Sequence, residues 1–133
     1  MIGVLVISHG AIGETLLSSA EAILGLKQAQ VAALGVSRND DPDAVLARAR
    51  ELAARLDEGS GVLVLTDMFG ATPCNVASRL LADGRVEGVS GLSLPMLVRV
   101  LAGRNGSLPA AVQRALSGGV EGVVHMNTDR CGA

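Results

Sequence analysis

Short runs of apolar residues alternate along the chain with longer segments in which apolar residues recur every three or four positions. The short runs predict strands, because a strand buried on both faces needs no polar alternation. The predicted strands cover residues 2–8, 30–36, 62–66, 86–90 and 120–126. The longer segments predict helices over residues 12–25, from Pro42 to about Leu56, from Pro73 to about Leu81, and over about residues 95–102 and 109–116.

The ends of the predicted helices carry start and stop signals. Asp41 precedes Pro42, and a capping side chain followed by proline at the first helical position is a common helix start. The pair Thr72-Pro73 repeats this arrangement, so Thr72 is predicted to be the N-cap of the third helix. Gly25 is predicted to end the first helix, because glycine readily adopts the left-handed conformation found there.

The alternation of strands and helices predicts an α/β fold. Sequential parallel strands joined by right-handed crossovers form an open, doubly wound, mostly parallel sheet with helices on both faces. The chain of 133 residues suits a single domain over residues 1–133. Hydrophobic residues make up 49% of the chain, yet Phe69 is its single aromatic residue. The core is therefore expected to consist of Val, Leu, Ile and Ala.

Composition and charge argue against several classes of function. The net charge is −2 and the charges are scattered, which does not favour nucleic-acid binding. The apolar runs are too short to cross a membrane, and the N-terminus does not resemble a signal peptide. With two unpatterned cysteines, we expect a reduced, cytoplasmic protein without a metal site. Neither a dinucleotide nor a phosphate-loop motif is present, and no Trp or Tyr could flank a flavin, so no cofactor is expected.

Two polar turns follow strongly predicted strands and mark the candidate site. The first is Ser8-His9-Gly10, and the second is Thr66-Asp67. Ligands of doubly wound sheets bind at the carboxyl ends of the strands, and the first and third strands are commonly adjacent. His9 and Asp67 are therefore expected to face each other across one crevice.

Each candidate residue also has a purely structural interpretation. A lone histidine at a strand end is often only a surface residue, but Gly10 leaves room beside His9 and a predicted helix start is close by, which favours phosphate. A neutral imidazole is also a competent nucleophile. Asp67 is either a turn residue or the carboxylate that orients His9. Thr72 could cap its helix and still present a hydroxyl to the crevice. His125 and Cys74 are interpreted as structural.

Three sequence blocks resemble a known family. They are GVLVISHG at residues 3–10, GVLVLTDMFGATPCNVAS at residues 61–78, and VSGLSLPML at residues 89–97. In this order they resemble the mannose-family enzyme IIA domain of the bacterial phosphoenolpyruvate-dependent sugar phosphotransferase system, over essentially the whole chain. The dihydroxyacetone-kinase phosphotransfer subunit is a related alternative that fits the middle block less well.

The resemblance implies roles for individual residues. It makes His9 the phosphorylated histidine and Asp67 the carboxylate beside it. Thr72 stands where the family usually has a serine that bonds the phosphoryl group, so Gly10 and Thr72 are expected to surround the phosphate. Cys74 stands where the family generally has a larger residue. The family fold further implies that residues 120–126 form an antiparallel edge strand that is exchanged across a homodimer.

Two functions are compatible with these residues. In the first, the chain is a phosphocarrier that accepts a phosphoryl group from the phosphocarrier protein HPr and passes it to a separate IIB component during sugar uptake. In the second, it is a regulatory protein whose phosphorylation on His9 informs a partner without feeding a transporter. In this family the sugar is selected by the membrane components, so the sequence does not identify it.

Overall fold

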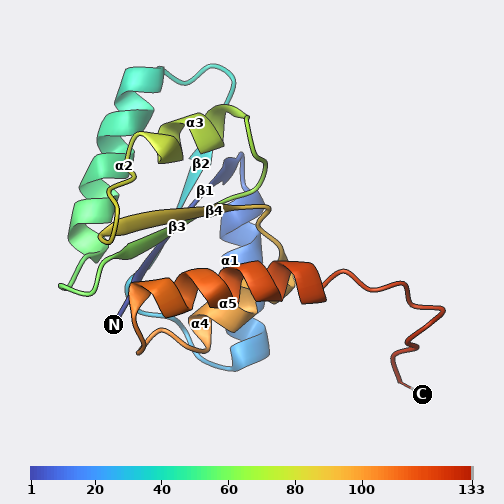
Figure 1. Cartoon of the computed structure of the whole chain (residues 1–133). Helices are drawn as coiled ribbons and strands as arrows, with labels where there is room; N and C mark the ends of the chain where they lie inside the picture. The colour runs from blue at the N-terminus through green and yellow to red at the C-terminus, as the bar shows by residue number, and fades with distance from the viewer. Residues whose placement is uncertain (133) are drawn as a thin grey trace.

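The centre of the molecule is a sheet of four parallel strands. The computed structural model describes residues 1–132. The strands are β1 (Gly3–His9), β2 (Val31–Val36), β3 (Val62–Thr66) and β4 (Val86–Ser90). They lie in the order β2-β1-β3-β4 (Figure 1). The four corresponding strand predictions are confirmed, and β1 and β3 are neighbours as expected.

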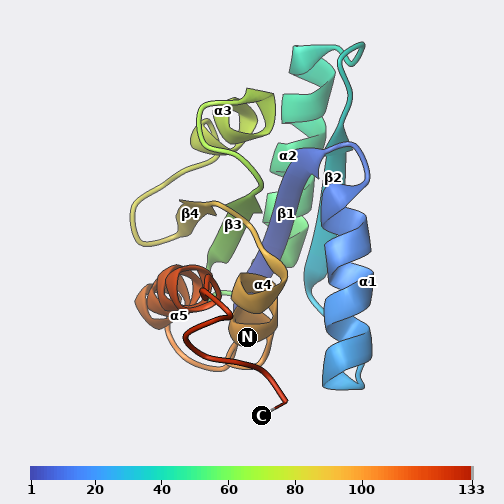
Figure 2. The same ribbon diagram turned by 90° about the vertical axis from the view of Figure 1, so that its right-hand side faces the viewer.

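Helices cover both faces of the sheet. They are α1 (Ile12–Leu24), α2 (Pro42–Leu56), α3 (Thr72–Ser78), α4 (Leu94–Leu101) and α5 (Leu108–Glu121). The helices α2 and α3 pack on one face, and α1, α4 and α5 lie on the other (Figures 1 and 2). The predicted doubly wound α/β architecture is therefore confirmed. No helix within residues 1–132 is both long enough and apolar enough to span a bilayer.

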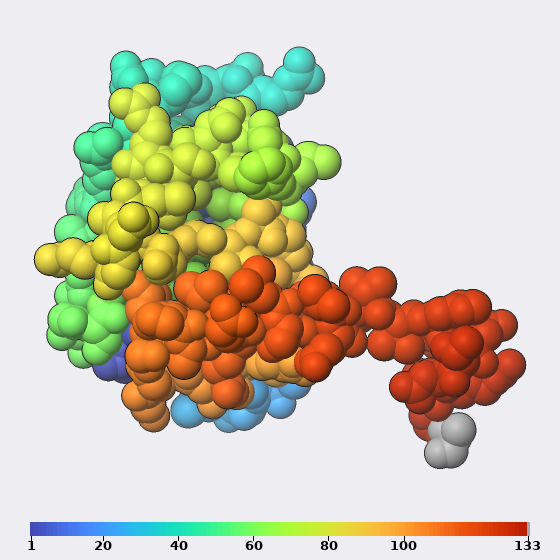
Figure 3. All heavy atoms as spheres, in the orientation of Figure 1, coloured from blue at the N-terminus to red at the C-terminus, as the bar shows by residue number. Residues whose placement is uncertain are grey.

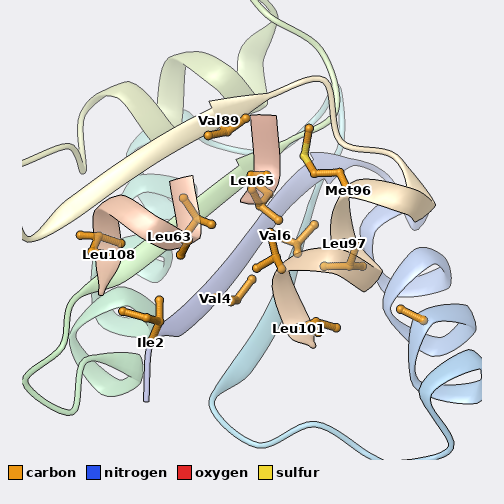
Figure 4. Close-up of a cluster of buried hydrophobic side chains, with 14 residues drawn as sticks. Ile2, Val4, Val6, Leu63, Leu65, Val89, Met96, Leu97, Leu101 and Leu108 are labelled. Atoms are coloured by element: carbon orange, nitrogen blue, oxygen red, sulfur yellow. The ribbon is translucent and has the colours of Figure 1, made fainter. Parts of the chain in front are cut away.

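The core consists of aliphatic side chains, as the composition predicts. Along β1, Val4 and Val6 point into the cluster formed with α1, α4 and α5, whereas Leu5 and Ile7 point toward α2 and α3. Figure 4 shows the first cluster, in which β1 and β3 side chains meet those of α4. All four of these β1 side chains are fully buried. Two-sided burial explains why the strand reads as a continuous apolar run.

Two of the predicted helix signals act as expected, and one does not. The Asp41 side chain accepts a hydrogen bond from the Asp43 amide at 3.2 Å, and Gly25 ends α1 with a φ of 69°. In α3, however, Ala71 is the N-cap and Thr72 is already the first helical residue. The Asn75 amide bonds the Ala71 carbonyl at 2.9 Å, which starts the helix one residue earlier than predicted. The prediction that Thr72 is the N-cap is wrong.

The predicted antiparallel edge strand over residues 120–126 is not confirmed. The helix α5 continues to Glu121, and residues 122–132 contain no strand. Leu108, Ala111, Ala115 and Gly118 recur at helical spacing and are buried, and this stripe outweighs the short alternation around Val120. The segment after α5 projects away from the body of the molecule (Figures 1 and 3), and His125 lies in it, exposed rather than in a strand.

A buried arginine holds together the end of the sheet at which the strands begin, opposite the end that carries His9. Arg104 is 4% exposed, and its guanidinium donates hydrogen bonds to the carbonyls of Ile2 and Gln30 at 3.1 Å each. It also donates to the Ala29 carbonyl. These bonds tie the starts of β1 and β2 to the loop after α4. The sequence analysis did not single out Arg104, because nothing in its neighbourhood marks it as buried.

Candidate functional site

His9 is the last residue of β1, one of the two central strands of the sheet. In the parallel pairing with β3, Ile7 lies opposite Thr66, so the segments that follow β1 and β3 leave the sheet side by side. Asp67, the residue after Thr66, therefore reaches the His9 backbone and ring. The structure brings these two predicted site residues together, as the sequence analysis expects.

Two hydrogen bonds join His9 to one oxygen of Asp67. The His9 backbone N–H donates to Oδ2 at 3.0 Å, and the ring Nδ1 lies 2.9 Å from the same oxygen. A carboxylate only accepts hydrogen bonds, so Nδ1 carries the ring proton in this contact. The other ring nitrogen, Nε2, then keeps its lone pair. The His9 side chain is 48% exposed, whereas that of Asp67 is 11% exposed.

The surroundings of Asp67 keep it ionised. Burial raises the pKa of the Asp67 carboxyl. The hydrogen bonds from the His9 backbone and ring, together with the charge of that ring, lower the pKa by a larger amount. The net result is a pKa below the ordinary value. An ionised Asp67 can therefore fix the orientation of the imidazole and stabilise positive charge on it.

The turn after His9 depends on two glycines. Gly10 has a φ of 47°, and its amide bonds the Val36 carbonyl at 3.0 Å. A Cβ atom on Gly35 of β2 would lie only 2.2 Å from the Gly10 carbonyl oxygen. The Gly10 backbone thus packs directly on β2, whereas a Cβ atom added to Gly10 itself would meet no atom within 4 Å.

Ser8 supports the site in a way that the sequence analysis did not foresee, although it placed Ser8 in the candidate turn. Its side-chain oxygen is buried and accepts a hydrogen bond from the Gly13 amide at 2.8 Å. The N-cap of α1, Ala11, has no capping side chain, so Ser8 supplies that function from the strand. This bond fixes the turn that carries His9. The usual capping signal is absent because the serine precedes the helix by several residues.

The remaining predicted residues do not touch the pair. Thr72 is exposed at the start of α3, and no hydrogen bond within residues 1–132 links it to His9 or Asp67. Cys74 is buried, as predicted for a structural residue. Within the same residues, no group of His, Cys, Asp and Glu side chains could hold a metal ion.

Exposed apolar side chains follow both site residues in the sequence. Phe69 is 85% exposed and Met68 is 61% exposed, and both directly follow Asp67. Ile12, at the start of α1, is 48% exposed. Apolar groups gathered around a half-exposed histidine are typical of a surface on which another macromolecule docks.

Comparisons with known proteins agree on one family. The family model described as "PTS system fructose IIA component" matches residues 3–116. The mannose-specific EIIAB component of Escherichia coli K12 is 34% identical over 125 residues, which are 92% of this chain. The chain spans only 38% of that relative's length.

Two further matches extend the comparison. The fructose-specific EIIA component of Bacillus subtilis is 30% identical over 76% of this chain and 69% of its own length. The crystal structure of a phosphotransferase system component EIIA from Streptococcus agalactiae superimposes with a TM-score of 0.85 and 28% identity. That superposition covers 96% of this chain and 99% of the other.

The hydrogen bonds of Asp67 predict its titration. We expect the Asp67 carboxyl to titrate below its ordinary pKa of 3.8, because its ionised form is the one that accepts from His9. A lowered pKa in the folded state contributes stability above the unfolded value of about 3.9, and this stability is lost as the pH falls through the folded pKa. Carbon-13 NMR of the carboxyl group measures the titration midpoint.

The control for this titration is the His9→Ala variant. Removing the ring removes one hydrogen bond and its charge while the backbone N–H stays, so the midpoint of Asp67 should rise. A midpoint at or above 3.8 in the unaltered protein would contradict the assignment.

Proposed function

This chain belongs to the family of IIA components of the mannose/fructose branch of the phosphotransferase system, and we propose that it is a phosphocarrier that accepts a phosphoryl group on His9. The observation that carries the proposal is the orientation of the His9 ring. Asp67 holds Nδ1 at 2.9 Å, which leaves Nε2 as the nucleophilic nitrogen on a half-exposed side chain.

The proposed step is a direct phosphoryl transfer between two histidines. Nε2 of His9 attacks phosphorus as the nitrogen–phosphorus bond to the donor breaks, and the donor nitrogen keeps that bond's electron pair. The His9 ring becomes positively charged while its Nδ1 proton stays in place. Asp67 stabilises this charge from the side of the ring opposite the phosphate, where it does not repel the phosphoryl oxygens. Phosphoryl transfer relies mainly on such positioning and electrostatics.

Gly10 and Thr72 are proposed to support the phosphoryl group in different ways. The Gly10 amide already bonds the Val36 carbonyl, so its contribution is the space that it leaves beside His9. Thr72 has an exposed hydroxyl at the start of α3. That hydroxyl could donate to a phosphoryl oxygen once the donor protein approaches.

The proposed partners are proteins. By family resemblance the donor is HPr and the acceptor is a IIB component, both of which must reach the same nitrogen. The exposed apolar side chains of Ile12, Met68 and Phe69 support docking by macromolecules at this edge. The nitrogen of a partner histidine could approach Nε2 directly, because the His9 ring is half exposed.

The association state is proposed to be a homodimer. No other strand within residues 1–132 pairs with the outer edge of β4. Next to this edge lies a shallow groove whose lining includes Leu116, Val120 and Val123, and these three side chains are exposed. An unpaired strand edge beside exposed apolar groups favours association, here through a self-complementary surface.

The first prediction concerns the modified residue. Incubation with phosphoenolpyruvate, enzyme I and HPr should add one phosphoryl group to the intact chain, which mass spectrometry detects. The product should be labile in acid and stable in base, as phosphohistidine is. His9→Ala should abolish the modification, because within residues 1–132 no other imidazole nitrogen is held by a carboxylate. His125→Ala is the matched control and should be labelled normally. Labelling of the His9→Ala variant would refute the proposal.

The second prediction concerns Asp67. Asp67→Asn keeps the shape of the side chain and removes its charge, so the charged His9 ring loses its stabilising partner. We expect phosphoryl exchange with HPr to slow at least ~10-fold, since a loss of about 1.4 kcal/mol in the transition state is already tenfold. Rapid-quench kinetics on the folded variant measures the rate.

Asp57→Asn is the control for the Asp67 experiment. Asp57 accepts hydrogen bonds from the Gly59 and Gly61 amides just before β3 begins, at the end of the sheet opposite His9. The same chemical change there should therefore leave the exchange rate unaltered. Equal rates for Asp67→Asn and the unaltered protein would contradict a role of Asp67 in the transfer and would leave it only as a turn residue.

The third prediction concerns the dimer. Light scattering at micromolar concentration should give twice the mass of the chain. Val120→Asp places a charge in the apolar groove beside β4 and should shift the protein toward monomer. Ile23→Asp makes a similar change at a side chain on α1 that is 59% exposed and should leave the dimer intact. A monodisperse monomer of the unaltered protein would exclude this assembly.

A further inference from the structure

A small cavity lies between α3 and the strands β3 and β4. Its volume is about 140 Å³. In Figure 1, α3 lies over this part of the sheet, so the cavity has the sheet as its floor and α3 as its roof. The lining residues come from the two strands, from α3 and from the segments that adjoin it: Val64, Thr66, Phe69, Cys74, Ala77, Ser78, Leu81, Gly88, Val89 and Ser90.

Short side chains create the cavity. Cys74 on α3 faces the cavity with a thiol, and Gly88 on β4 has no side chain to fill it. A Cβ atom added to Gly88 would lie 3.0 Å from the end of the Leu81 side chain, so even one methyl group would enter the cavity. The lone aromatic residue, Phe69, lines the cavity although it is 85% exposed, which places it at the opening.

Two hydroxyl groups in the cavity lack partners. Thr66 Oγ1 and Ser90 Oγ are buried and have no hydrogen-bond partner within residues 1–132. Thr66 is 3% exposed. The two residues are paired in register across β3 and β4, so the hydroxyls lie on neighbouring strands. Buried polar groups in proteins are nearly always satisfied by a partner, and here the cavity is the space from which one could come.

The lining defines the chemistry of a ligand. No charged side chain lines the cavity, and the carboxylate of Asp67, the residue after Thr66, disfavours an anion there. An apolar cavity of 150 Å³ in another protein holds one benzene molecule, so this one accommodates a compact body of about six to eight non-hydrogen atoms. The few hydroxyl groups that line the cavity cannot form hydrogen bonds with all the hydroxyls of a sugar.

We propose that this cavity is a binding site for a small, uncharged molecule with an apolar body and one hydroxyl or carbonyl group. The apolar body lies against Val64, Ala77 and Leu81, and the polar group exchanges hydrogen bonds with Thr66 and Ser90. Neither His9 nor Asp67 lines this cavity, so the site is distinct from the nitrogen that is proposed to accept the phosphoryl group. The inference rests on the cavity and its hydroxyls and does not depend on the proposed phosphocarrier function.

Phenol and toluene are matched probes for this site, because they have the same size and differ by one hydroxyl. Titration of the full chain, followed by proton–nitrogen NMR, should show phenol binding with a dissociation constant of about 1 mM, a plausible affinity for so few atoms. The shifted amides should be those of β4, α3 and the residues between Thr66 and Phe69. Toluene should bind at least ~5-fold more weakly, and mannose should cause no shifts there.

Three variants test which atoms are responsible. Thr66→Val keeps the volume and removes a hydroxyl, so it should reduce the preference for phenol over toluene at least ~3-fold. Gly88→Val fills the cavity and should weaken both probes at least ~10-fold. Cys74→Leu fills it from the opposite side, with the same expected effect. Gly106→Val makes the same change as Gly88→Val in a distant loop and should alter neither affinity.

Thermal unfolding confirms that each variant is folded before its binding is compared. Equal affinity of phenol and toluene, or unchanged phenol affinity in the folded cavity-filling variants, would overturn the proposal. Absence of any shift at these amides with phenol in large excess would do the same, and would mean that the cavity holds only water.

Discussion

Parallel pairing of β1 with both of its neighbours is the constraint on which the rest of the structure depends. The side chains of Val4 to Ile7 are buried on both faces of the sheet, and burial of each such side chain contributes about 1.5–3 kcal/mol. The His9–Asp67 pair is partly exposed, and pairs of that kind contribute only about 0.2–1 kcal/mol. The sheet therefore positions the pair, and the value of the pair lies in orienting the His9 ring rather than in stability.

A core without aromatic residues has consequences near the site. Aliphatic side chains from β1 and β3 fill the space beneath α1 and α4 (Figure 4), but α3 contributes only short side chains such as Cys74 and Ala77. The short helix therefore leaves a cavity above β4, where Gly88 has no side chain to fill it. Close packing and a small binding site thus follow from the same restricted set of residues, distributed differently over the two faces of the sheet.

The sequence predicted the features that depend on local pattern. Four strands and the start of α2 followed from apolar runs and from the pair Asp41-Pro42, and the adjacency of His9 and Asp67 followed from strand order. The edge strand over residues 120–126 was not confirmed, because the buried stripe that ends in Gly118 extends α5 to Glu121. The capping role of Ser8 was missed because its partner amide, that of Gly13, lies beyond the usual capping spacing. Arg104 was missed because its partners, the carbonyls of Ile2 and Gln30, are distant in the sequence.

The geometry of the His9–Asp67 pair also bears on why such a site suits a carrier. Both hydrogen bonds end on the same oxygen of Asp67, and neither involves Nε2. In the proposed relay, arrival of a phosphoryl group at Nε2 breaks neither bond and leaves the Nδ1 proton where it is. The charged ring that results faces a carboxylate that is already in place, so little reorganisation accompanies the transfer. Because the proposed transfer leaves both hydrogen bonds to Asp67 in place, the same arrangement serves transfer onto His9 and transfer away from it, as a relay between two proteins requires.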